Sequence, residues 1–121
     1  MITNHGLLYI EPQGPPSALP LIDALTRKMA AAFRQAESTG DRYRGFHICR
    51  CGGAHSDNTD WILPSDEQTN SLCVHYLAFH RDEVPAWQLA KIAAFIDEAE
   101  PTAKELQVPT RRRAAGERVT R

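Results

Sequence analysis

The chain has 121 residues, of which 42% are hydrophobic and 24% are charged, and its formal net charge is −1. A chain of this length and composition can bury one core, so we expect a single globular domain rather than a disordered or multidomain protein. No apolar run approaches the length of a membrane-spanning helix, which argues against a membrane protein.

The N-terminal part predicts a strand, a loop and a helix. Residues 1–14 lack the basic start, long apolar centre and cleavage site of a secretory signal, so we expect a cytoplasmic protein. The run LLYIE at 7–11 is typical of a short strand, which the prolines of PQGPP end. From Pro20 onward, apolar residues recur at spacings of three and four and predict the first helix, which STGD at 38–41 closes. The apolar positions are Ile22, Leu25, Met29 and Phe33.

The central and C-terminal parts predict a hairpin and two more helices. The runs at 42–50 and 60–64 favour two strands of a loose hairpin. Residues 69–81, TNSLCVHYLAFHR, start with good helix-capping residues and predict the second helix, and Pro85 fits the start of a third. After the third helix, the segment EPTAKELQ predicts a short additional turn. The sequence therefore predicts an α+β fold in which a small sheet, made of the N-terminal strand and the central hairpin, packs against three helices.

The C-terminal residues 110–121 differ in charge from the rest of the chain. They hold five arginines and one glutamate, hence +4, whereas residues 1–109 hold nine basic and fourteen acidic groups, hence −5. An arginine-rich end predicts a solvated, disordered tail after a compact domain at 1–109. Because the acidic body offers no second basic patch, the pattern argues against a nucleic-acid partner and leaves an unknown protein partner open.

The segment HICRCGG, residues 47–53, has the residue types of a metal site. On an extended strand His47, Cys49 and Cys51 would share a face, with about 6.6 Å between alternate residues. Two sulfur ligands of a tetrahedral zinc ion lie only about 3.8 Å apart, so a bend must bring the cysteines together. Gly52 and Gly53 permit such a bend because they reach positive φ angles.

The second predicted helix supplies further candidate ligands. It carries Cys73, His75 and His80. Cys73 and His75 would diverge by about 200° on a helix, and Cys73 and His80 would stand about 10.5 Å apart along its axis. We therefore rank His75 first and Cys73 second as the helix ligand, place His80 behind them, and take His47 as the best candidate from the hairpin side. The predicted zinc ligands are thus Cys49, Cys51, His75, Cys73 and His47.

An alternative interpretation of these cysteines involves no metal. The usual zinc knuckle has two residues between its cysteines and this chain has one, whereas small buried cysteines are common in strands. The odd count of three cysteines still favours thiols or metal ligands over a disulfide framework. His80 could instead cap a helix end, and His55 lies in a predicted loop.

Two segments of this chain also resemble segments of a known group of proteins. HICRCG followed by TNSLCVHYLAFHRDEVP resembles a group of short uncharacterised bacterial proteins with H-x-C-x-C-G and T-N-S-L-x-x-H-Y segments, over residues 43–92. The resemblance implies that the hairpin and the second helix act together. It implies no activity.

Three functions fit these features. The first is a non-enzymatic binding or interaction module with a structural zinc site. The second is a thiol enzyme that uses Cys73, a histidine base and Asp60. The third is a hydrolase with an open metal position and Asp57, Asp60 or Asp66 acting on bound water, although the sequence has no H-E-x-x-H motif.

Overall fold

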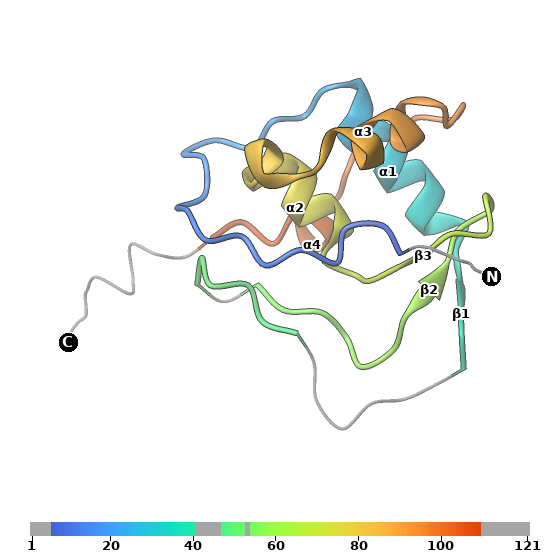
Figure 1. Ribbon diagram of the computed structural model, residues 1–121, viewed down its shortest axis with the longest axis horizontal. Coiled ribbons are helices and arrows are strands. Elements are labelled where there is room, and N and C mark those ends of the chain that lie inside the picture. Colours follow the sequence, from blue (N-terminus) through green and yellow to red (C-terminus); the bar gives the residue numbers. More distant parts are fainter. Residues whose placement is uncertain (1–5, 41–46, 53, 110–121) are drawn as a thin grey trace.

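The computed structural model describes residues 6–40, 47–52 and 54–109. Within these ranges the chain forms several helices and a small three-stranded antiparallel sheet, which confirms the predicted α+β class (Figure 1). The predicted tail at 110–121 and part of the predicted strand at 42–50 lie outside the described residues. The elements are α1 Ala24–Arg34, β1 Glu37–Ser38, β2 Trp61–Ile62, β3 Gln68–Thr69, α2 Cys73–Phe79, the 3-10 helix η1 Arg81–Glu83, α3 Ala86–Ala93 and α4 Ala103–Leu106.

Helix α1 begins at an aspartate cap. The Asp23 carboxylate accepts a hydrogen bond from the Thr26 amide at 3.1 Å, which satisfies one of the free N–H groups of the first turn. The helix therefore starts a turn later than Pro20 suggested. The same carboxylate pairs with both terminal nitrogens of the Arg81 guanidinium, at 2.7 and 2.9 Å. This ion pair joins the start of α1 to η1.

The sheet has the order β1-β2-β3 and is made of two-residue strands. Trp61 pairs with Ser38 on one side and with Thr69 on the other. The predicted apolar run at 60–64 thus contributes a strand, and its described partners are β1 and β3. The described residues 47–52 and 54–56 are joined to each other instead, through an antiparallel bridge between Ile48 and His55.

The predicted N-terminal strand is irregular. Leu7 and Leu8 are both fully buried, which an extended strand with only one face on the core would not achieve. Leu8 has a φ of 64°, so the chain turns between the two side chains. One backbone bond of 2.8 Å still joins the Leu7 amide to the Gln68 carbonyl beside β3. The segment lies along the sheet without extending it.

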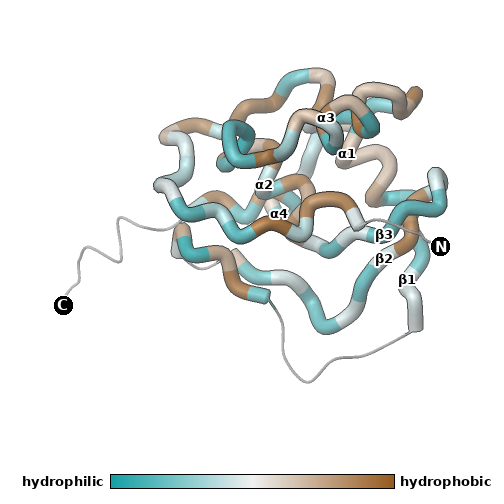
Figure 2. The backbone as a smooth tube through the Cα atoms, viewed as in Figure 1, coloured by the Kyte–Doolittle hydropathy of each residue, from teal (hydrophilic) through white to brown (hydrophobic). Residues whose placement is uncertain are grey.

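Helix α2 lies at the centre of the core. Every one of its seven residues is buried, and it packs against both α1 and α4. Figure 2 shows apolar stretches in each of α1, α2 and α3. Polar side chains on α2, such as His75, therefore lie inside the hydrophobic core. Among the described residues, no helix has the length and apolar character needed to cross a membrane.

Candidate metal centre

Four side chains from two separate segments meet in the core. One ligand atom from each of Cys49, Cys51, His75 and His80 lies within 4.8 Å of the other three. The Cys49 Sγ is 3.3 Å from the His80 Nε2, and the Cys51 Sγ is 3.2 Å from the His75 Nε2. With Zn–S near 2.3 Å and Zn–N near 2.0 Å, a tetrahedral ion sets its sulfur and nitrogen ligands about 3.6 Å apart. The group therefore has the dimensions of a site for one small metal ion.

A tight turn brings the two cysteines together. The Cys49 amide donates to the Ala54 carbonyl at 2.9 Å, and the Cys49 carbonyl accepts from the Gly52 amide at 3.5 Å. Gly52 has a φ of 108°, a conformation that residues with a Cβ rarely adopt. The expected bend is thus confirmed at Gly52, while Gly53 lies outside the described residues.

One histidine, His75, lies in the first turn of α2, and the other, His80, directly follows the helix. In an unbroken helix His75 and His80 would stand about 140° apart and about 7.5 Å along the axis. Helix α2 ends at Phe79, and His80 has the non-helical angles φ −133° and ψ 37°. Their rings lie side by side, with centroids 5.3 Å apart. Ranking by ideal helix geometry placed His80 behind His75 and Cys73 because the sequence did not show where the helix stops.

The other two predicted ligands stand outside this group. Cys73 begins α2, is fully buried, and has a side-chain hydrogen bond with Thr69. Because successive helical residues turn by about 100°, it points away from His75. His47 is exposed, and its amide donates to the Ser56 hydroxyl at 2.8 Å. Of the five predicted ligands, the structure brings together Cys49, Cys51 and His75, and it adds His80.

Burial favours the neutral forms of the histidine rings. It lowers the pKa of His75 to about 4 and also lowers the pKa of His80. Both rings are therefore neutral at physiological pH and keep a lone pair for a metal ion. The His75 Nδ1 lies 2.9 Å from the Leu106 carbonyl, which can only accept, so Nδ1 carries the proton. The bare Nε2 then faces Cys51, as a metal ligand requires.

The four side chains are better suited to bind a metal ion than to form hydrogen bonds with one another. Burial, followed by the neighbouring Cys49, raises the pKa of the Cys51 thiol. Within the described part of the chain, the buried His80 Nδ1 has no hydrogen-bond partner. Two thiols and two neutral imidazoles in an apolar core satisfy one another poorly, because a thiol is a weak donor. A cation at their centre would convert four poorly paired groups into ligands.

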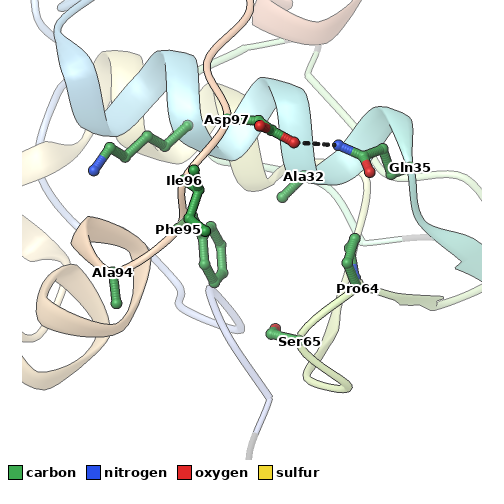
Figure 3. Close-up of a pocket in the computed structure, with 9 residues that line it drawn as sticks. Ala32, Gln35, Pro64, Ser65, Ala94, Phe95, Ile96 and Asp97 are labelled. Atoms are coloured by element: carbon green, nitrogen blue, oxygen red, sulfur yellow. Dashed lines mark hydrogen bonds between the residues drawn. The ribbon is translucent and has the colours of Figure 1, made fainter.

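The centre is enclosed by protein. Cys49, His75 and His80 are at most 2% exposed, and Cys51 is 9% exposed. A pocket of about 280 Å³ lies between α1 and residues 94–97 (Figure 3), and its Gln35 and Asp97 side chains are hydrogen-bonded to each other at 3.2 Å. A second pocket of about 570 Å³ is lined by residues of α1, β2 and α4, among others. Neither pocket is lined by any of the four grouped residues.

Comparisons of this chain with protein-family models, curated proteins and solved structures found no match. The geometry of the four-residue group is therefore the basis for assigning a function.

Proposed function

We propose that this protein is a small zinc-binding domain with a structural site, and that it serves as a non-enzymatic binding or interaction module in the cytoplasm. Cys49, Cys51, His75 and His80 would bind one zinc ion. The observation that carries this proposal is that their four ligand atoms lie within 4.8 Å of one another inside the core.

The donor set supports zinc over other common metals. Two thiolates and two imidazoles in a tetrahedral arrangement are typical zinc ligands, whereas calcium and magnesium prefer oxygen. None of the four grouped residues offers an oxygen ligand from its side chain. The neutral histidines are already in the form that binds the ion.

The position of the site supports a structural role. The ion would join the 47–56 turn to α2, two segments that are distant in the sequence. The His75–Leu106 hydrogen bond extends this connection to α4. The Gln107 side chain then returns to the turn, because it bonds both the amide and the carbonyl of His55, at 3.0 and 2.9 Å. Structural zinc sites have four protein ligands and contribute directly to folding.

The thiol-enzyme alternative finds little support. Cys73 is fully buried, and burial raises its pKa to about 12, whereas a nucleophilic cysteine needs an accessible thiolate. Asp60, the orienting group of this alternative, accepts hydrogen bonds from Tyr9 and Gln68 instead.

Metal analysis tests the proposal directly. The untagged protein, purified without added zinc and without a nickel column, should contain about one equivalent of zinc by elemental analysis. A strong chelator should remove the zinc and lower the melting temperature, because the free energy of metal binding is part of the folding free energy. Protein that is free of metal and melts at the same temperature with chelator would contradict the proposal.

Matched histidine variants sharpen the test. His80→Ala should lose zinc, because His80 is a member of the group, whereas His47→Ala should keep it, because His47 is exposed and outside the group. If His47→Ala lost zinc and His80→Ala kept it, the ligand set would be the one predicted from the sequence, which includes His47 and not His80.

A further inference from the structure

We infer that the zinc site is a redox-sensitive switch, in which a hydroperoxide converts Cys49 and Cys51 into a disulfide and releases the ion. This inference rests on the proposed function, since it concerns the same site. It is carried by the closeness of the two thiols, by their unequal exposure and by the separate placement of the third cysteine.

The two thiols are close enough to join with little movement. A single residue separates them, and the turn closed by the Cys49 carbonyl and the Gly52 amide places both on one side. Their sulfur atoms belong to the group of atoms that lie within 4.8 Å of one another. A disulfide needs Cα atoms about 4.4–6.8 Å apart, which residues two apart within a turn can satisfy. The bond can therefore form inside the turn, without displacing a helix.

Exposure decides which sulfur reacts first. Cys51 is 9% exposed, whereas Cys49 is 2% and His75 is 0% exposed. We therefore expect a small oxidant to reach Cys51, the more exposed of the two residues, before Cys49, which acts as the resolving thiol. Cys73 is fully buried and outside the group, so it should stay reduced.

The chemistry balances with a hydroperoxide as the oxidant. The Cys51 thiolate attacks the peroxide, the O–O bond breaks, and with one proton the products are a sulfenic acid and water or an alcohol. The Cys49 thiolate then attacks the Cys51 sulfur, and hydroxide leaves and takes up a second proton. The sulfur atoms lose two electrons in total, which reduce the peroxide. Two imidazoles alone then remain for the zinc, and the ion dissociates.

Zinc loss would loosen one part of the fold. The 47–56 segment holds itself together by the Ile48–His55 bridge and neighbouring backbone bonds, and Ile48 is 61% exposed. Without the ion, this segment loses its link to His75 and His80. The other contacts of α2 with α1 do not depend on the ion. Oxidation should therefore alter the turn while the helical core stays folded.

The test uses the full-length, zinc-loaded protein and hydrogen peroxide. Released zinc is measured with a chromogenic chelator, and the protein is then denatured, alkylated and analysed by mass spectrometry. We expect zinc release to parallel a loss of about 2 Da, a peptide linked between Cys49 and Cys51, and alkylation of Cys73 alone. Dithiothreitol with added zinc should restore the starting protein.

Two variants serve as controls. Cys73→Ser should release zinc as the parent does, because Cys73 is outside the group. Cys49→His keeps four ligands but removes the resolving thiol, so oxidation should stop at a sulfenic acid that dimedone traps. If this variant does not load zinc, the linked-peptide map of the parent protein decides the question.

The outcomes separate the two proposals. Protein that contains no zinc overturns both the structural site and the switch. Protein that contains zinc but keeps it under peroxide, or that yields a Cys51 sulfinic acid beside an alkylated Cys49, overturns the switch alone.

Discussion

At the scale of single residues, the centre depends on a few backbone conformations. Gly52 holds a φ of 108° in the turn between the cysteines and Ala54, and His80 leaves the helical conformation at the end of α2. The sequence predicted Cys49, Cys51 and His75, because paired thiols beside glycines and a helix histidine are recognisable locally. It ranked His80 behind the other helix candidates, because the position of His80 depends on the residue at which α2 stops. It also favoured Cys73, which is buried in packing instead.

Gly52→Ala should destabilise the turn and weaken zinc binding. A Cβ at this φ costs about 1–3 kcal/mol, and here the strain falls on the residue directly after the ligand Cys51. Gly40→Ala is the matched control, because Gly40 has a φ of 90° outside the site, where an added Cβ would meet no other group within 4 Å. Competition with a zinc chelator should show weaker zinc binding for Gly52→Ala than for Gly40→Ala. Equal zinc affinities in the two variants would show that the turn does not position the ligands.

Zinc affinity should rise with pH. Burial and the neighbouring Cys49 raise the pKa of the Cys51 thiol, so this thiol must lose its proton when it binds the ion. His75 releases no proton near neutral pH, because burial lowers its pKa to about 4. Each thiol that gives up a proton makes binding about tenfold tighter per pH unit. Competition titrations at pH 6, 7 and 8 should show at least this slope, and an affinity independent of pH would argue against thiolate ligands.

At the scale of elements, the helices were more predictable than the strands. The apolar spacing from Ile22 to Phe33 predicted α1, and Pro85 marked the start of α3, where it is the N-cap. Strands of two residues carry no period that a sequence pattern could reveal. The run at 7–11 looked like a strand, but the positive φ of Leu8 lets two adjacent leucines enter the core.

The Asp23–Arg81 pair should make stability depend on pH in the acid range. The Arg81 guanidinium lowers the pKa of Asp23 from 3.8 to about 2. The contribution of this ion pair to the free energy of unfolding is therefore fully present above about pH 4 and is lost as the pH falls toward 2. Asp23→Asn keeps a capping side chain but removes the charge. In urea unfolding of metal-free protein, the variant should be less stable than the parent at pH 5, and the difference should shrink toward pH 2. A constant difference would exclude the ion pair as its cause.

At the scale of the whole molecule, the centre connects parts that the sequence keeps far apart. Residues 47–56, α2 and α4 meet around the four side chains and the Leu106 carbonyl. The sequence predicted that a turn and a helix would share a metal ion. It could not predict the role of α4, because a backbone carbonyl that orients a histidine leaves no pattern in the side chains.

The most direct test is X-ray absorption at the zinc K-edge on the purified, untreated protein. The four-residue site predicts a shell of two sulfurs at about 2.3 Å and two nitrogens at about 2.0 Å. A shell with three sulfurs would indicate that Cys73 is also a ligand. An oxygen ligand from water would indicate an open, catalytic position. Either result, or an absence of bound zinc, would contradict a closed centre made by Cys49, Cys51, His75 and His80.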